Sequence, residues 1–436
     1  MSRDPLITND LVTFGILAGV LGLIFYTSSS SHPFFKKFYK YVPALLLAYM
    51  VPALLSSLHV IGESWHTVQD GHTLTVHSRL YYVASRLLLP AALVLFTLSI
   101  DLKAIMRLGW KALFMFFAGT VGIIIGGPVA LAVGGYFFPE LVEASGNDAT
   151  WRGLATLAGS WIGGGANQAA MLEIFEYNQE LYGGMVLVDI VVANIWMALL
   201  LIGVNYNDRI NRRLKADTSA IEELKRRVME FSRKNMRIPE LRDYMVILGV
   251  AFFTVAVSFM AATWISESLK SAFPVIADKS SKLSSLGSHF FWLISLSTFA
   301  GILYSFTRLR NLEGAGASRI GSVFIYYLVA TIGMKIDLTK IFDRPELMLV
   351  GLIWMFIHAV IMIAAAKWSR SPYFFLAVGS QANVGGAASA PVVASAFHPA
   401  LTSVGALLAI LGYVVGTYGA WLSAMLMSMV TEWLRS

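Results

Sequence analysis

The chain contains no cysteine. A disulfide framework and a thiolate metal site are therefore excluded, because both need Cys side chains. Charged residues are also scarce: they make up 14% of the 436 residues, whereas a typical soluble domain has about 25%. A larger soluble core does not explain this deficit, because surface grows with size and must be wetted. With 57% hydrophobic residues and a mean hydropathy of +0.66, the sequence predicts a membrane protein.

Signatures of several other function classes are missing too. The sequence has no Walker P-loop and no H-E-x-x-H zinc motif. The pairs Gly159-Ser160 and Gly379-Ser380 resemble nucleophile contexts only superficially, because no His or Lys base accompanies them. We therefore expect neither an enzyme nor a cofactor other than a coupling ion. The net charge of +7 does not indicate nucleic-acid binding, because most cations lie in loops between apolar runs.

The apolar runs are predicted to be transmembrane helices. Helices and closed barrels are the structures that satisfy their backbone polar groups in lipid, and barrel strands alternate apolar and polar residues. Residues 246–264 and 347–366 are instead almost continuously apolar. Since a span needs about 20 apolar residues, we expect an all-α polytopic fold with about ten transmembrane helices, at residues 10–27, 41–60, 80–99, 111–135, 182–204, 244–265, 288–306, 320–334, 347–367 and 400–428.

Two further apolar segments, 153–175 and 372–398, are interrupted by Gly, Ser, Asn and Gln. Loop 204–243 carries eleven Lys or Arg, so the positive-inside rule places it in the cytoplasm together with loops 28–40 and 101–110. The first interrupted segment must then enter and leave from outside, and the second from inside. We expect two re-entrant hairpins in a multi-pass protein of the bacterial inner membrane, with both termini outside, 22 Lys and Arg inside and 10 outside.

The order of features occurs twice along the chain. Residues 100–105 (IDLKAI) match residues 336–341 (IDLTKI) at four of six positions, and a glycine-rich segment follows one span later in each case. The sequence predicts two inverted membrane repeats, namely residues 1–203 with hairpin 153–175 and residues 244–436 with hairpin 372–398. Chance similarity between apolar segments is the alternative. Residues 204–243 are predicted to be a basic, amphipathic cytoplasmic linker, because apolar residues recur there at helical spacing, at Ile221, Leu224, Val228 and Phe231.

The two glycine-rich segments are the predicted binding site. A helix break leaves N–H and C=O groups without partners, and lipid tolerates this only where they line a cavity or meet protein or ligand. Half-helix N-termini favour anions, and exposed carbonyls favour cations. Small-residue packing would explain the glycines and serines but not the buried amides, which are costly when unpaired. The candidate substrate- or ion-binding residues are Ser160, Gly163, Gly164, Gly165, Asn167, Gln168, Ser380, Gln381, Asn383, Gly385, Gly386 and Ser389.

Asp189 is one of the few ionisable residues predicted to lie inside a span, and Asn194 follows a little over one helical turn later. A carboxylate at the membrane centre is costly, so it is a functional candidate by default. It would carry a coupling proton, ligate Na⁺ or pair with a solute amine; the alternative is a structural carboxylate that is bonded to polar neighbours. We expect a Na⁺ ion, if one is coupled, near Asn167, Asp189 and Asn383.

Three other ionisable residues have less direct interpretations. Arg86 lies early in a span, where it either snorkels to the outer surface or binds a substrate carboxylate. Glu173 follows the first hairpin, and we expect it to be solvated at the outer mouth. His358 is expected to be a packed core residue.

Residues 159–167 (GSWIGGGAN) and 380–386 (SQANVGG) resemble the YjcL-like integral membrane family, also called domain of unknown function 819, and the resemblance extends over nearly the whole chain. The family is similar in plan to sodium/glutamate-symporter-like and other inverted-repeat carriers, which have paired interrupted elements. The resemblance implies a carrier. The resemblance does not identify the solute. It implies only that the residues of these two phrases form the site.

We therefore expect a secondary active transporter, elevator-like, in which the hairpins and adjoining spans move against a scaffold. The solute would be a small carboxylate-bearing molecule, such as an amino acid or short peptide, coupled to Na⁺ or H⁺. An ion or solute channel and a non-transporting membrane receptor or scaffold are the alternatives. The expected partners are this solute and the lipid bilayer, with a homodimer left open.

Overall fold

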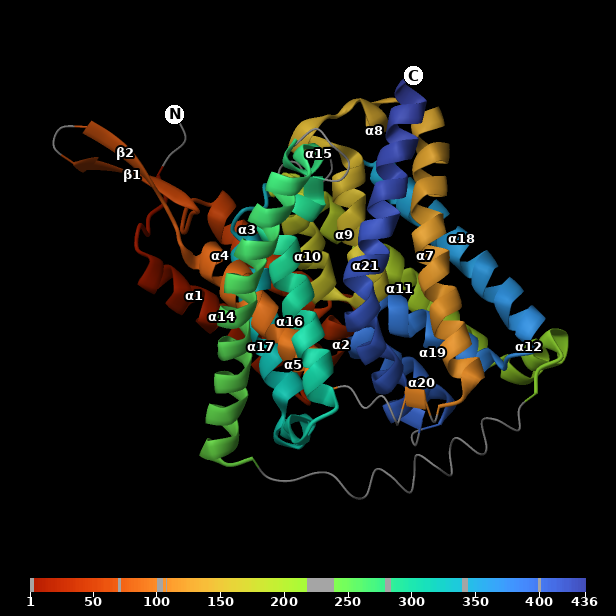
Figure 1. The fold of residues 1–436 in the computed structure, drawn as a ribbon. Coiled ribbons are helices and arrows are strands. Elements are labelled where there is room, and N and C mark those ends of the chain that lie inside the picture. The colour runs from red at the N-terminus through yellow and green to blue at the C-terminus, as the bar shows by residue number, and fades with distance from the viewer. Residues whose placement is uncertain are drawn as a thin grey trace.

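The computed structural model describes residues 4–69, 72–99, 105–106, 108–217, 239–278, 284–338, 344–398 and 401–436. These residues are almost entirely helical (Figure 1). Seven of the described helices are long and apolar enough to cross a membrane, or nine if each of two sharply bent helix pairs is one span, and α17 (Ala317–Gly333) is a shorter apolar helix. The predicted all-α polytopic membrane fold is confirmed.

Six helices form a first bundle, which occupies the left half of Figure 1. Within it α5 packs against α16 and α17, while α3 packs against α1 and α17, and α14 against α16. Pro90 stands at the start of α5, directly after helical turns that α5 continues, so its missing N–H leaves one helical hydrogen bond unmade. The bundle consists of α1 (Asp10–Ser28), α3 (Ala44–Ser57), α5 (Leu89–Leu98, continuing α4, Leu80–Val83, and the π-helical turn η1, Ala84–Leu88), α14 (Leu241–Ala272), α16 (His289–Ser305) and α17.

A second bundle lies beside the first, on the right of Figure 1. Its long helices are α7 (Trp110–Phe137), α11 (Tyr182–Val204), α18 (Glu346–Ser369) and α21 (Thr402–Arg435), and α7 packs against both α18 and α21. Glycines allow the approach of α7 to α18: a Cβ atom on Gly126 would lie 2.5 Å from the Trp354 side chain, and one on Gly127 2.6 Å from it. Small residues permit such close contacts between membrane helices.

The first interrupted segment is a helical hairpin inside this bundle. Helix α9 (Thr150–Gly163) ends at Gly164, whose φ of +77° favours glycine, and α10 (Gly165–Ile174) runs back along α9. A Cβ atom on Gly159 would lie 2.6 Å from the Asn167 carbonyl oxygen. At the open end, the Asn178 N–H donates to the Asn147 carbonyl at 2.9 Å. Both ends of the segment therefore lie together; we call it hairpin 1.

The second interrupted segment has the same form. Helix α19 (Tyr373–Val384) and helix α20 (Gly386–Phe397) are linked across the turn by a 2.7 Å bond from Gln381 Nε2 to Ser389 Oγ. At the open end, the rings of Phe374 and Phe397 are 5.3 Å apart. The tips of hairpin 1 and this hairpin 2 meet, because a Cβ atom on Gly386 would lie 3.7 Å from the Gly164 Cα atom.

Shorter elements connect the long helices. A two-stranded antiparallel sheet, not predicted from the sequence, joins β1 (Ser64–Gln69) to β2 (His72–His77). Helix α12 (Asn207–Leu214) follows α11, and the predicted amphipathic helix around residues 221–231 lies outside the described residues, as do residues 100–104 and 339–341 of the repeat motif. The remaining short elements are α2 (Pro33–Tyr41), α8 (Glu140–Glu143), η2 (Gly146–Asp148), α15 (Pro274–Ala277), η3 (Ser284–Gly287) and η4 (Arg308–Ala315).

The close approach within hairpin 1 yields a stability prediction. Gly159→Ala should lower the free energy of unfolding by about 1–3 kcal/mol, because the new methyl group meets backbone atoms that cannot move aside. Gly165→Ala is the matched control in the same hairpin, since a Cβ atom there meets nothing within 4 Å. Thermal unfolding of the purified variants in detergent measures both changes, and equal midpoints would contradict the hairpin packing.

Candidate solute-binding site

A cavity of about 390 Å³ lies at the meeting point of the hairpin tips. The first bundle closes its other side with residues of α5 and α17, including Phe96, Ser322, Ile325 and Tyr326. Nine of the residues predicted from the sequence line this cavity: Ser160, Gly164, Gly165, Asp189, Asn194, Gln381, Gly385, Gly386 and Ser389. Small-molecule sites typically have volumes of about 300–1,000 Å³, so the space suits a small solute.

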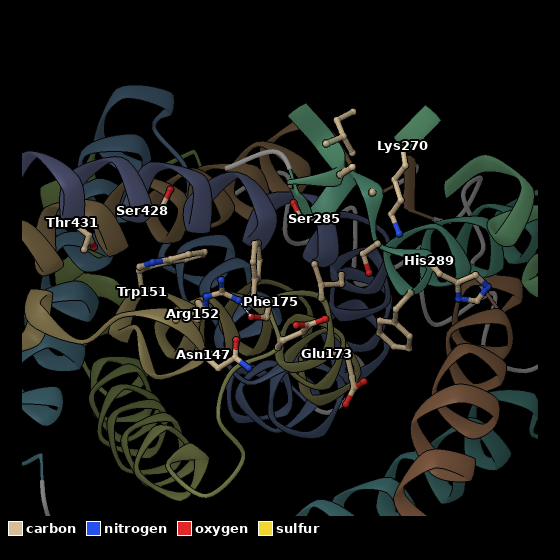
Figure 2. A pocket seen from close by; sticks show the side chains of 18 of the residues that line it. Asn147, Trp151, Arg152, Glu173, Phe175, Lys270, Ser285, His289, Ser428 and Thr431 are labelled. Atoms are coloured by element: carbon tan, nitrogen blue, oxygen red, sulfur yellow. Dashed lines mark hydrogen bonds between the residues drawn. The ribbon is translucent and has the colours of Figure 1, made fainter. Parts of the chain in front are cut away.

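A larger hollow of about 800 Å³ lies at the open end of hairpin 1 (Figure 2). Its charged lining is of mixed sign and includes Arg152, Glu173 and Lys270. The hairpin tips are not part of it. We therefore take the smaller cavity, which collects the interrupted backbone and its polar side chains, as the candidate site.

Two helix N-termini meet at this cavity. Helix α10 begins at Gly165 and α20 begins at Gly386, and both glycines line the cavity. The first N–H groups of a helix have no intrahelical partner, and the helix dipole places partial positive charge at this end. An anionic group bound between the tips would meet both helix N-termini.

Asp189 serves as an acceptor for hairpin 1. Its carboxylate accepts hydrogen bonds from Ser160 Oγ at 2.7 Å, Trp161 Nε1 at 2.7 Å and Gln168 Nε2 at 3.1 Å. The first two donors lie on α9 and the third on α10, so this one side chain of α11 holds both helices of the hairpin. Asp189 is 5% exposed. Among the described residues, the side chain of Asn194 bonds only within the same helix, from Nδ2 to the Ile190 carbonyl at 2.7 Å.

Asn167 and Asn383 are fully buried and do not line the cavity. Asn167 Oδ1 accepts a 2.6 Å hydrogen bond from Thr417 Oγ1, and its Nδ2 donates to the Gly163 carbonyl. Asn383 Oδ1 accepts a 2.8 Å bond from Thr120 Oγ1, and its Nδ2 donates to two backbone carbonyls. Each amide therefore braces a hairpin against a long helix. Asn167, Asn383 and Asp189 each bond to different partners and share none of them.

A signal for these braces was present in the sequence and was missed. Residues 119–122 read GTVG and residues 416–419 read GTYG. In each phrase the threonine donates to a hairpin asparagine, and the glycine makes room for it. A Cβ atom on Gly119 would lie 2.8 Å from Asn383 Nδ2, and one on Gly416 2.7 Å from Asn167 Nδ2.

Ser380 lies one residue before Gln381 and does not line the cavity. Its hydroxyl accepts from Trp196 Nε1 at 2.8 Å and lies 2.8 Å from His358 Nε2. The Gly119 carbonyl lies 3.2 Å from His358 Nδ1. Since a carbonyl only accepts, Nδ1 carries the proton and Nε2 accepts from the Ser380 hydroxyl. His358 is a buried core residue, as expected, and in addition it orients hairpin 2.

Gln381 and Ser389 are the residues of hairpin 2 that line the cavity with polar side chains. Among the described residues, Gln381 Oε1 has no hydrogen-bond partner, while its Nε2 is occupied by Ser389. Gly163, Asn167, Gln168, Ser380 and Asn383 are the predicted residues of the two segments that do not line the cavity.

Arg86 is not part of the tip cavity but lines the larger hollow. Its Nη1 lies 2.8 Å from Glu173 Oε2, and its guanidinium lies over the Phe290 ring at 4.4 Å. The expectation of a solvated Glu173 is wrong, because the Glu173 side chain is only 8% exposed. Its partner comes from a span about ninety residues earlier, a contact that local sequence patterns do not reveal.

The helices and their enclosed, interrupted hairpins define a multi-pass α-helical membrane protein. The chain belongs to the family described as "Protein of unknown function (DUF819)", whose model matches residues 9–430. The curated "Uncharacterized membrane protein YjcL" of Bacillus subtilis (strain 168) is 27% identical to it over 379 residues, which cover 81% of this chain and 86% of the relative. The family resemblance read from the two glycine-rich phrases is confirmed.

The bonding of Asp189 predicts a loss of stability. Asp189→Ala should destabilise the fold, because each buried donor left without an acceptor costs about 1–3 kcal/mol. Asn194→Ala, on the same helix and the same cavity wall, removes only a bond to its own backbone and should change the unfolding midpoint far less. Thermal unfolding in detergent compares the two variants; an equal loss would argue against the brace.

Proposed function

We propose that the chain is a secondary active transporter of a small carboxylate-bearing solute. The observation that carries this proposal is the meeting of two glycine-broken hairpins, with two helix N-termini, at one cavity inside a membrane bundle. Interrupted helices at membrane depth are typical of transporter binding sites. A purely structural bundle would have no need for two broken helices at its centre.

The lining of the cavity supports the solute class. Among the described residues that line it, none is Lys or Arg, so the helix N-termini supply the positive field for a carboxylate. Phe96, Ile325 and Tyr413 form an apolar wall, which suits the remainder of an amino acid or a short peptide. Gln381 Oε1 and Ser389 Oγ would orient the polar groups of the solute.

Movement of the second bundle against the first would give alternating access. The second bundle contains both hairpins, while the first bundle contributes one wall of the cavity. The polar solute site would then travel within its own bundle, as in an elevator mechanism. The coupling ion is Na⁺ or H⁺. The oxygens of Asp189, Asn167 and Asn383 are of the type that hard cations prefer, but each of these residues already accepts hydrogen bonds from its own partners, so an ion ligated there would have to replace those donors.

The helix pairings support two inverted repeats, residues 1–203 and 244–436. Helix α5 packs on α17, and α7 on α18, as expected of counterparts related by a two-fold axis. The contact between α1 and α17 has its counterpart between α14 and α5, and that between α3 and α17 has its counterpart between α16 and α5. Both hairpins fit the same scheme, with each second helix beginning at the tip.

Uptake by proteoliposomes tests the function. We expect accumulation of at least one carboxylate solute from a panel of amino acids, short peptides and dicarboxylates, driven by a Na⁺ or H⁺ gradient. Gly386→Val should abolish it, because Gly386 has a φ of +57° and lies at the tip contact. Gly249→Val is the control on α14, where a Cβ atom meets nothing within 4 Å. Unaltered uptake by the Gly386 variant would remove the tips from the mechanism.

The proposed location is the bacterial inner membrane, with the basic loops in the cytoplasm and both termini outside. Lys111 and Arg370 gather with Asp217 at one end of the second bundle. Arg344, which bonds Thr150 at the start of hairpin 1, lies at the other. The excess of positive charge at the end of the bundle where α12 lies supports the placement of that end in the cytoplasm.

Cysteine labelling tests this orientation, since the chain has no native cysteine. A membrane-impermeant maleimide should label Glu143→Cys in intact cells and Arg213→Cys only after permeabilisation, because the two exposed residues are proposed to lie on opposite sides. Labelling of Arg213→Cys from outside would invert the topology.

A further inference from the structure

Helix α12 lies at the end of the second bundle, below the end of α18 in Figure 1. Ile210, Asn211 and Leu214 turn toward the bundle, where Ile210 and Leu214 join its apolar core. Arg209, Arg212 and Arg213 are exposed on the other side of the same helix. The proposed function does not assign any role to this basic face.

Further cations and two tryptophans lie at the same end of the second bundle as α12. Lys111 Nζ contacts both Asp217 Oδ2, at 3.1 Å, and the Arg370 carbonyl, at 3.4 Å, so α7, the end of α18 and the segment after α12 converge there. The Trp110 ring lies 6.0 Å from Phe114, and Phe114 lies 5.5 Å from Trp368. We call the exposed members of this group the α12 rim: Trp110, Arg209, Arg212, Arg213, Lys215, Lys367, Trp368 and Arg370.

The two tryptophans of the α12 rim are largely exposed. Trp368 is 77% exposed and Trp110 is 59% exposed. In the part of the chain that the structure describes, none of the six cations of the rim forms an ion pair. Tryptophan is enriched where membrane headgroups meet the apolar core, and arginine binds phosphate groups through paired hydrogen bonds. The combination fits lipid headgroups that carry net negative charge.

The rim is connected to hairpin 2 by specific hydrogen bonds. Asn211 Oδ1 accepts a 2.8 Å bond from the Tyr373 N–H, in the first turn of α19. The Asp217 N–H donates to the Arg370 carbonyl at 3.2 Å. A group that fixes α12 against the bundle therefore also fixes the open end of hairpin 2, whose tip lines the cavity.

We propose that the α12 rim binds the headgroups of anionic phospholipids and that bound lipid holds α12 against the base of hairpin 2. General positive-inside charge would need only net charge on this side of the membrane. The rim adds arginines on the outer face of a docked helix and neighbouring exposed tryptophans, an arrangement suited to a headgroup and its attached acyl chains. Anionic lipid would then restrict the opening of hairpin 2 at its base.

Lipid-dependent unfolding of the full chain in detergent tests the binding step. Dioleoyl-phosphatidylglycerol should raise the thermal unfolding midpoint more than dioleoyl-phosphatidylcholine at the same concentration. The triple variant Arg209→Gln, Arg212→Gln, Arg213→Gln should lose at least half of that difference. The matched control, Lys36→Gln, Lys37→Gln, Arg308→Gln, removes three exposed cations elsewhere and should keep it. Comparing the two lipids within each variant removes any change in basal stability.

Cysteine labelling tests the coupling to hairpin 2. Ser371 is fully buried between the end of α18 and α19, so Ser371→Cys should react with maleimide more slowly in phosphatidylglycerol than in phosphatidylcholine nanodiscs. Ser145→Cys, exposed at the other end of the bundle, should react equally in both. The triple arginine variant should abolish the difference at residue 371.

Three results would overturn the proposal: equal midpoints with the two lipids, loss of the lipid difference in the Lys36, Lys37, Arg308 control, or equal labelling of residue 371 in both nanodiscs. A rise of the same size with inorganic phosphate would replace the lipid with a free anion. None of these readouts depends on uptake, so the lipid proposal and the transport proposal fail separately.

Discussion

The rest of this structure depends on one constraint: a backbone broken inside lipid must have its polar groups satisfied by protein or ligand. Both hairpins break at glycines, at Gly164 and at Gly385–Gly386. Each is packed against long helices, hairpin 1 against α21 and α11 and hairpin 2 against α7 and α21. Glycines on α7 and α21 allow these helices to approach the hairpins closely, which leaves little room for lipid at the breaks.

The constraint divides the polar side chains into two groups. The hydrogen bonds of Asp189, Asn167 and Asn383 hold the hairpins in place. Gln381 and Ser389 face the cavity, together with the backbone of the tips. A residue type that looks like a ligand in the sequence is thus often a brace in the fold, because a buried amide or carboxylate near a break must find partners whether or not a solute is present.

Sequence reasoning predicted the features that local pattern determines. Continuous apolar runs indicated the helices, and glycine with polar residues indicated the two breaks, which the structure places at residues 164 and 385. It could not predict the pairings across the bundle. Glu173 pairs with Arg86, and Asp189 bonds to Trp161, only when separate helices pack together. The sheet at Ser64–Gln69 and His72–His77 was not predicted because it lies in a polar segment between two apolar spans. The roles of the GTVG and GTYG phrases were not predicted because their partners are distant in the sequence.

The distribution of the braces bears on the proposed movement. Among the described residues, the side-chain bonds that hold the hairpin tips end on α7, α11, α18 and α21, all within the second bundle. Within the described ranges, side-chain bonds that cross to the first bundle lie elsewhere; examples join Arg86 to Glu173, Tyr81 to Gln179, and Ser285 to Trp421. A rigid-body displacement of the second bundle would therefore keep the hydrogen bonds of the tips intact, but it would break these crossing bonds and move the tips away from the cavity wall that the first bundle supplies. Arg86 and Glu173 are an ion pair whose side chains are 31% and 8% exposed. Because separating a partly buried charge pair without new partners is costly, their contact opposes the proposed displacement.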